Sequence, residues 1–160
     1  MVRGKNNGFE LIGINNVSEP ELEDIHPLAG SFAIIEIEGS YLLGYNSLRN
    51  QWELPAGKRE EDETPLECAK RELSEETGQI VEDLQLIGLA RVKNLRSQYE
   101  KFNPLYFATI HSLMPFKRNE ETTKIMLWNF SGNITIDQVD LAILQFIVKI
   151  RREHKAKDKI

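Results

Sequence analysis

Apolar and polar positions alternate along several short stretches of the chain, as is typical of half-buried β-strands. Stretches of this kind, rich in β-branched and aromatic residues, predict strands at residues 9–14, 32–37, 41–45, 52–54, 86–92, 105–111 and 125–130. Glu38, Gly39 and Ser40 form a turn signal between two of these stretches, so residues 32–45 are expected to fold as a hairpin.

Two other segments have helical spacing. Thr64 is a good N-cap, Pro65 suits the first helical position, and Glu67 completes a capping box. Helix-forming residues occupy 66–76, and Gly78 follows as a C-cap. A second helix is predicted to begin near Asp137, with apolar positions at helical intervals: Val139, Ala142, Ile143, Phe146, Ile147 and Ile150.

Strands interleaved with helices and hairpins predict an α/β domain with a mixed β-sheet. A length of 160 residues corresponds to one domain. Residues 1–29 are expected to form an N-terminal extension, either a strand or an arm, residues 30–154 the main domain, and residues 155–160 a basic tail.

The composition narrows the class of protein. Hydrophobic residues make up 41% and charged residues 28%, which is globular composition. The net charge of −5 argues against a general nucleic-acid coat protein. No apolar run approaches a membrane span, and the first ten residues lack the hydrophobic core of a signal peptide. These features predict a cytoplasmic protein without a membrane partner. Cys68, the one cysteine, is expected to be a small buried residue and not a nucleophile.

Three carboxylates share one arc of the first predicted helix. With Glu72 as the angular zero, Glu76 lies at about 40° and Glu75 at about −60°. Like charges so placed repel, and a bound divalent cation would reverse the sign of that interaction. Oxygen ligands favour Mg²⁺ or Mn²⁺ over zinc. Arg71, four residues before Glu75, can bond to it. The alternative is a solvated acidic helix face.

The spacing of residues before and within this helix favours a metal site over a solvated acidic helix face. Gly57 is followed after five residues by Glu63, after seven more by Arg71-Glu72-Leu73, and then by Glu75-Glu76 and Gly78. Seven fixed positions would coincide by chance on the order of once in 10⁸ starting points. The run resembles the sequence signature of the Nudix (MutT-like) hydrolases, and residues 52–58, WELPAGK, resemble the strand and turn that precede it in that family. One position departs from the signature, because Gln79 stands where the family has an aliphatic residue.

The resemblance implies an α/β/α sandwich and a Mg²⁺-dependent (or Mn²⁺-dependent) hydrolase of nucleotide phosphoanhydrides. It implies that Glu72, Glu75 and Glu76 bind the metal together with the backbone carbonyl of Gly57 or its neighbour Ala56. It further implies that Arg71 orients a glutamate of the helix, and that Glu63 is more structural than catalytic.

Residues outside this run are weaker candidates. The family places its general base either within the signature or on a later loop, where Glu121 is the first candidate and Glu120 and Glu100 are others. Arg49, Arg91 and Tyr99 are candidates for substrate binding, the last two from a segment at 91–101 that also contains lysines. The alternative for each of these residues is an exposed loop position.

The sequence does not determine which substrate is hydrolysed. A nucleoside triphosphate, including oxidised forms, and ADP-ribose or a nucleotide sugar are both compatible with the signature. Two other functions are a nucleotide-binding module that has lost catalysis and an RNA 5′-end pyrophosphohydrolase. The acidic composition makes a nucleic-acid partner the less favoured expectation, and a homodimer is a further possibility that no sequence feature decides.

Overall fold

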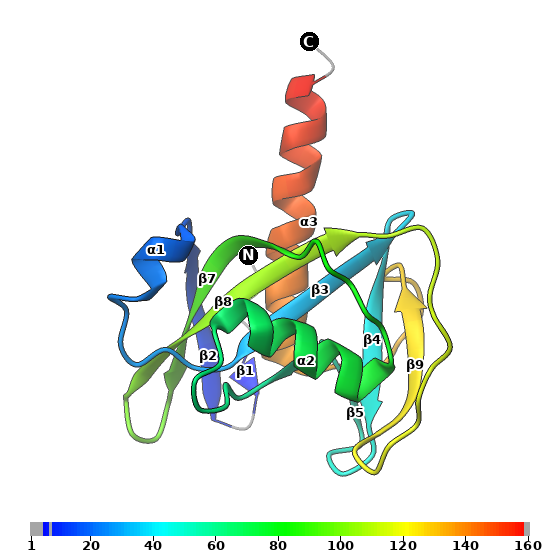
Figure 1. Cartoon of the computed structure of the whole chain (residues 1–160), viewed down its shortest axis with the longest axis horizontal. Helices are drawn as coiled ribbons and strands as arrows, with labels where there is room; N and C mark the ends of the chain where they lie inside the picture. The colour runs from blue at the N-terminus through cyan, green and yellow to red at the C-terminus, as the bar shows by residue number, and fades with distance from the viewer. Residues whose placement is uncertain (1–4, 7, 159–160) are drawn as a thin grey trace.

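The computed structural model describes residues 5–6 and 8–158 (Figure 1). A curved sheet forms its centre, and helices lie on both faces of the sheet. The strands are β1 (Lys5–Asn6), β2 (Phe9–Asn15), β3 (Ser31–Ile37), β4 (Ser40–Asn46), β5 (Gln51–Glu53), β6 (Ala56–Gly57), β7 (Gln85–Asn94), β8 (Glu100–Thr109) and β9 (Thr122–Trp128). The helices are α1 (Glu19–Leu22), α2 (Pro65–Thr77) and α3 (Gln138–Asp158).

The strand order is β1-β2-β7-β8-β3-β4-β5, with β9 paired to β4 and β6 paired to β3. Among the described strands, β3 and β8 run parallel, and the other named pairs are antiparallel. The predicted mixed α/β sheet is therefore confirmed. Strand β2 pairs along its length with β7, so this part of the N-terminal segment belongs to the sheet.

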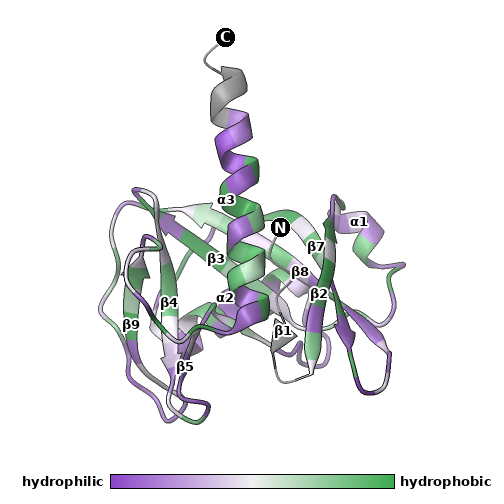
Figure 2. Cartoon of the chain, turned by 180° about the vertical axis from the view of Figure 1, so that it is seen from behind, coloured by the Kyte–Doolittle hydropathy of each residue, from purple (hydrophilic) through white to green (hydrophobic). Residues whose placement is uncertain are grey.

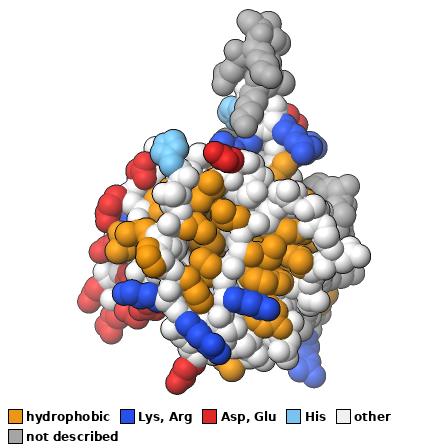
Figure 3. All heavy atoms as spheres, turned by 90° about the vertical axis from the view of Figure 1, so that its right-hand side faces the viewer, with side chains coloured by type: hydrophobic (Ala, Val, Ile, Leu, Met, Phe, Trp, Pro, Cys, Tyr) orange, Lys and Arg blue, Asp and Glu red, His pale blue; other side chains and the backbone are white. Residues whose placement is uncertain are grey.

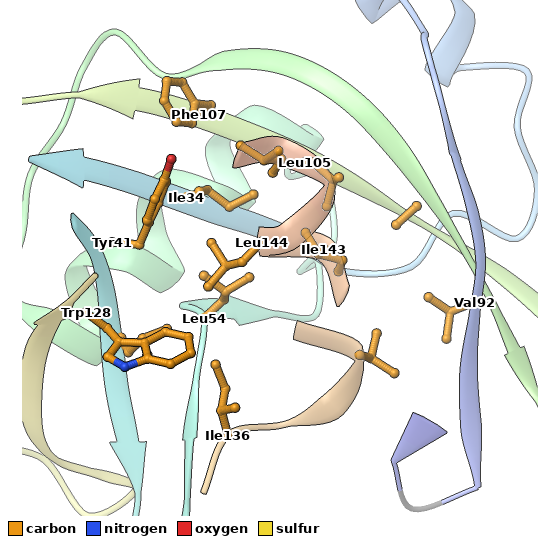
Figure 4. Packing of buried hydrophobic residues seen from close by; sticks show 14 residues of the cluster. Ile34, Tyr41, Leu54, Val92, Leu105, Phe107, Trp128, Ile136, Ile143 and Leu144 are labelled. Carbon is orange, nitrogen blue, oxygen red and sulfur yellow. The ribbon is translucent and has the colours of Figure 1, made fainter. Parts of the chain in front are cut away.

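Each face of the sheet has its own apolar core. Helix α2 covers one face, where Leu73 packs with Ile35 and Leu42. Helix α3 crosses the opposite face, as the view from behind shows (Figure 2). There Ile143 and Leu144 pack among side chains from several strands, including Ile34 and Leu105 (Figure 4). Burial on both faces produces the three-layer sandwich that the resemblance implies.

The ends of α2 follow the predicted capping chemistry. The Thr64 hydroxyl accepts a hydrogen bond from the Glu67 N–H at 3.1 Å, and the Glu67 carboxylate accepts one from the Thr64 N–H at 3.0 Å. Gly78 adopts a left-handed conformation (φ 80°) and donates its N–H to the Ser74 carbonyl. This fixed helix start and end determine where the carboxylates of α2 lie.

The structure differs from the sequence prediction at several elements. Strand β8 begins at Glu100, five residues before the predicted start at Leu105. The reason is that its polar first residues also pair with β7, out to the pair formed by Lys93 and Glu100. Strands β1 and β6 and the short helix α1 were not predicted. All three are too short to carry a periodic signal, and β6 is defined by its pairing with β3.

The surface shows where polar groups gather. From the side of β4 and β9, apolar side chains are interspersed with single cations, and acidic side chains gather toward the side that carries α2 (Figure 3).

Within the described residues, no helix is long and apolar enough to cross a membrane.

Candidate active site

A cleft of about 640 Å³ brings together residues from both faces of the sheet. Its acidic residues are Glu53, Glu72, Glu76, Glu121, Asp137 and Asp140, and its cationic residues are Arg49, Lys58 and Lys101. The rest of the lining is Phe9, Gly30, Phe32, Leu54, Ala56, Gly57, Val92, Asn103 and Val139. A volume of this size is typical of a small-molecule site.

Two glycines allow the backbone and a carboxylate to approach closely at the floor of the cleft. A Cβ atom on Gly57 would overlap the carboxyl group of Glu72, and one on Gly30 would overlap the carbonyl group of Gly57. Glycine is therefore required at both positions for contact and not for an unusual φ angle. The Gly57 carbonyl oxygen accepts a hydrogen bond from the Cys68 thiol at 3.2 Å, which leaves its second lone pair for another partner. Cys68 is fully buried, as predicted, and burial raises the pKa of its thiol.

Arg71 holds several of the acidic side chains of this region. Its guanidinium donates two bonds to Glu63, at 2.6 and 3.0 Å, and one each to Glu72 at 2.7 Å and Glu75 at 3.1 Å. A further bond, at 2.9 Å, goes to the carbonyl of Lys58, in the loop that follows Gly57. The hydrogen bond to Glu75 expected from the sequence is present, and the bonds to Glu63 and Lys58 connect the start of the signature to its helix.

Glu76 is a strongly perturbed carboxylate of the cleft. Its Oε2 accepts a hydrogen bond from the Ala56 N–H at 3.0 Å. Burial raises its pKa to about 9, and the neighbouring carboxylates Glu72, Glu121 and Glu53 act in the same direction. Burial also raises the pKa of Glu72. Without a cation, these groups therefore cannot all be ionised at neutral pH.

Glu121 is the member of the predicted general-base set that reaches the cleft. Its carboxylate accepts a hydrogen bond from the Asn46 side chain at 3.1 Å. The loop before it is fixed to the end of α2, because the Asn119 side chain donates to the carbonyls of Glu75 and Glu76. Glu120 and Glu100 are not among the cleft residues.

The other predicted site residues divide into two groups. Arg49 lines the cleft, and its guanidinium pairs with Glu53 at 3.1 Å. Glu75 is exposed outside the cleft, where it contacts Arg71. Arg91 and Tyr99 also lie outside the cleft lining. Arg91 pairs with Glu100, and Tyr99 is 79% exposed in the turn between β7 and β8.

Several lining residues were not singled out from the sequence, although the candidate binding segment 91–101 includes Lys101. Lys101 and Asn103 lie two positions apart on β8 and therefore face the same side of the sheet. Phe9 reaches the cleft from β2, and Phe32 reaches it from β3. The sequence signal for these positions was the alternation of side chains along residues 100–109. Because the first residues of this strand are polar, the alternation does not indicate which face of the sheet lines the cleft.

The part of the cleft formed by Glu72, Glu76 and Gly57 fits a hard divalent cation. Its candidate donors are the carboxylates of Glu72 and Glu76 and the carbonyl of Gly57, all of them oxygen ligands. The raised pKa of Glu76 shows that burial opposes its negative charge in the absence of a cation. Over the described part of the chain, no three His, Cys, Asp or Glu side chains are already arranged as a metal-binding cluster. Glu72 and Glu75 each accept a hydrogen bond from Arg71 through one carboxylate oxygen.

Comparisons with known proteins show which family the chain resembles. The NUDIX domain family model matches residues 27–129, which is more than half of the chain. A segment of 55 residues is 42% identical to the RNA pyrophosphohydrolase of Xylella fastidiosa (strain Temecula1 / ATCC 700964). That segment covers 34% of this chain and only 29% of the relative.

Solved structures extend the similarity to the whole fold. A variant of the Bacillus subtilis pyrophosphohydrolase BsRppH aligns over 96% of this chain and 98% of its own, with a TM-score of 0.68 and 24% identity. The MutT NUDIX hydrolase from Burkholderia pseudomallei aligns over 76% of this chain and 98% of its own, with a TM-score of 0.62 and 20% identity. At these identities the structures establish the fold alone.

Proposed function

Because this chain belongs to the Nudix family, we propose that it hydrolyses a phosphoanhydride bond of a nucleoside phosphate with the help of a divalent cation. The observation that carries the proposal is the meeting of Gly57, Glu72 and Glu76 in one cleft. These residues come from the two ends of the signature, and the close contact at Gly57 brings them together.

Glu72, Glu76 and the Gly57 carbonyl would hold the cation, with Glu75 joining them after a change of rotamer. Nudix hydrolases generally use divalent metal ions. A bound Mg²⁺ or Mn²⁺ would neutralise charge on the phosphate oxygens and make a bound water more acidic. Arg71 would keep Glu72 oriented through the hydrogen bond at 2.7 Å.

In the reaction, the oxygen of a water molecule forms a bond to one phosphorus, and the bridging P–O bond to the other phosphate breaks. The attacking water must lose a proton. Glu121 is our candidate for the acceptor because it lines the cleft and its carboxylate is oriented by Asn46. The leaving phosphate takes the electron pair of the broken bond.

Two substrate classes have support. The acidic composition and the volume of the cleft favour a free nucleoside phosphate or a nucleotide diphosphate derivative. The segment shared with an RNA pyrophosphohydrolase favours a second candidate, the 5′-phosphorylated end of RNA. The full set of signature carboxylates argues against a module that binds nucleotides without cleaving them.

The test is chromatography of products from a substrate panel incubated with Mg²⁺. The panel contains nucleoside triphosphates and diphosphates, an oxidised triphosphate, ADP-ribose, a nucleotide sugar and a short 5′-triphosphorylated RNA. We expect cleavage of at least one compound, abolished by EDTA and reduced by two or more orders of magnitude in Glu76→Gln. An inactive wild-type protein, or a Glu76→Gln variant of normal rate, would contradict the proposal.

A further inference from the structure

A buried side-chain amide joins the candidate general base to the end of strand β4. Asn46, the last residue of β4, donates one hydrogen bond to Glu53 at 2.9 Å and one to Glu121 at 3.1 Å. We propose that Asn46 is a positioning residue, which acts on the reaction by holding Glu121 and does not itself contact the substrate. This inference rests on the hydrolase function proposed above, and it gives a role to a residue that lies outside the family signature.

Every hydrogen-bonding position of the Asn46 amide is occupied. Its Oδ1 accepts the backbone N–H groups of Leu48 at 3.0 Å and Arg49 at 3.1 Å, which forms a turn at the end of β4. Since the oxygen faces these N–H groups, the NH₂ group faces the two carboxylates. A side-chain amide has two donors and an oxygen with two lone pairs, so no further bond can form. Because Asn46 is also only 3% exposed, it offers no free polar group and almost no surface to a substrate.

The two carboxylates that Asn46 contacts differ in what they leave free. Glu53 uses both of its oxygens, since Oε2 accepts from Arg49 at 3.1 Å and from Gln51 at 2.7 Å. Glu121 accepts from Asn46 through Oε1, and its Oε2 has no hydrogen-bond partner in the described part of the chain. Glu53 is therefore the anchored side of the bridge, and Glu121 keeps one oxygen free to accept a proton.

The sheet is irregular at the point where Asn46 meets the loop that carries Glu121. Strands β4 and β9 lie side by side (Figure 1), and their register shifts between Tyr45 and Asn46, so that Asn46 pairs with Thr122. An irregularity of this kind changes the direction of a side chain and is common beside active sites. The carbonyl of Glu121 accepts the N–H of Ser47 at 2.9 Å. Two successive residues therefore hold both the side chain and the backbone of Glu121.

This restraint matters because the Glu121 side chain is exposed at the end of a loop. Without a partner, its carboxylate would rotate about several side-chain bonds. A general base must lie within hydrogen-bond reach of the water from which it takes the proton, and small displacements of such groups have large effects on rate. Loss of the Asn46 donor should therefore lower kcat and leave KM almost unchanged.

Asn46→Asp separates this role from the turn, because aspartate keeps the oxygen that forms the turn and lacks the NH₂ donors. At saturating Mg²⁺, we expect kcat for the substrate that the panel identifies to fall about tenfold or more, with a change in KM of less than about threefold. Thermal unfolding checks that the variant is folded. Asn46→Ser is a second, neutral variant that can still form a weaker turn, and it should show the same loss of kcat.

Asn94→Asp is the matched control. Asn94, the last residue of β7, forms the same kind of turn, since its Oδ1 accepts the N–H groups of Arg96 at 3.0 Å and Ser97 at 3.1 Å. It lies outside the cleft lining. Asn94→Asp should therefore keep the wild-type kcat and KM.

A double-mutant cycle identifies the carboxylate through which Asn46 acts. In a Glu121→Gln background, Asn46→Asp should lower kcat by less than about twofold, because the group that Asn46 positions is already inactive. In a Glu53→Gln background, the loss of about tenfold should persist. A wild-type kcat in Asn46→Asp or in Glu121→Gln, or an undiminished loss in the Glu121→Gln background, would overturn the inference and leave the hydrolase function intact.

Nuclear magnetic resonance of ¹⁵N-labelled protein tests the bridge without turnover. We expect the Asn46 NH₂ protons to exchange with solvent at least about tenfold more slowly than those of Asn94, and their signals to shift in Glu121→Gln. Rapid exchange, or signals that do not respond to Glu121→Gln, would overturn the inference. If the wild type cleaves nothing in the panel, the proposed function fails, and this experiment still decides whether Asn46 holds Glu121.

Discussion

Gly57 lies directly against the carboxylate of Glu72, so closely that a single methyl group on Gly57 would occupy the space of that carboxylate. The contact joins the loop at the start of the signature to the helix at its end. A second close contact lies beneath it, where Gly30 admits the carbonyl of Gly57. The position of Glu72, a candidate metal ligand, therefore depends on the absence of a side chain at both Gly57 and Gly30.

We expect Gly57→Ala to lower the rate at least a hundredfold while the protein stays folded. The new methyl group would displace only the far end of a flexible side chain, but a misplaced ligand has a large effect on rate. Steady-state kinetics and thermal unfolding are the measurements. Gly30→Ala is the informative comparison, because its methyl group would meet backbone atoms and should destabilise the fold itself. A fully active Gly57→Ala protein would show that the position of Glu72 does not limit the reaction.

Arg71→Lys should reduce both stability and activity, although it conserves the charge. A lysine cannot reproduce the forked contact with Glu63 together with the bonds to Glu72 and Lys58. We expect the free energy of unfolding to fall by about 1–3 kcal/mol in urea titrations. Lys70→Met is the control, since Lys70 forms an ion pair with the exposed Glu82 and its loss should cost less than about 1 kcal/mol. Equal effects from the two substitutions would contradict this assignment.

Gln79→Leu restores the aliphatic residue of the family signature, yet we expect it to destabilise this protein. Gln79 is buried, and its amide exchanges two hydrogen bonds with the backbone of Met114, at 2.7 and 2.9 Å. Leucine would leave those backbone groups without their partner, at a cost of about 1–3 kcal/mol. Hydrogen exchange at the Met114 amide should accelerate. The exposed Gln85 provides the control as Gln85→Leu, and a Gln79→Leu protein of unchanged stability would show that the two bonds contribute nothing net.

Asp140→Asn should stabilise the protein increasingly as the pH rises above about 4. Asp140 is buried beside Asp137 and Glu53, and burial raises its pKa well above the ordinary value. Well below pH 4 the group is protonated in both the folded and the unfolded state, and no penalty arises. At higher pH the unfolded chain gains by ionising Asp140 and the folded chain does not, so stability is lost, at about 1.4 kcal/mol per unit of pKa difference.

Asparagine avoids this loss and can still accept the hydrogen bond from the Leu54 N–H at 2.9 Å. Urea unfolding at pH 4 and pH 7 measures the effect. The variant and the wild type should be similar at pH 4, and the variant should be more stable at pH 7. Asp83→Asn, at an exposed position, should show no such divergence. A difference in stability that does not grow with pH would refute the explanation.

The sequence by itself determined the parts of this protein that depend on local geometry. The start and end of α2 follow from Thr64, Glu67 and Gly78, because capping bonds form within three or four residues of each other. The spacing of Glu72 and Glu76 places them on one arc of a helix whatever surrounds it, and both line the cleft. The alternation of apolar residues likewise predicted the larger strands.

Only the tertiary structure decided which groups meet those carboxylates. Strand pairing between β7 and β8 turned Lys101 toward the cleft and left Arg91 and Tyr99 outside its lining, and a shift of one residue in register would exchange the two faces. Glu121 reaches the cleft because Asn119 fixes its loop to a helix end more than 40 residues earlier in the chain. Contacts of this kind depend on pairing between distant segments, which periodicity along the chain does not encode, so the sequence could name Glu121 as a candidate but could not show that it reaches the cleft.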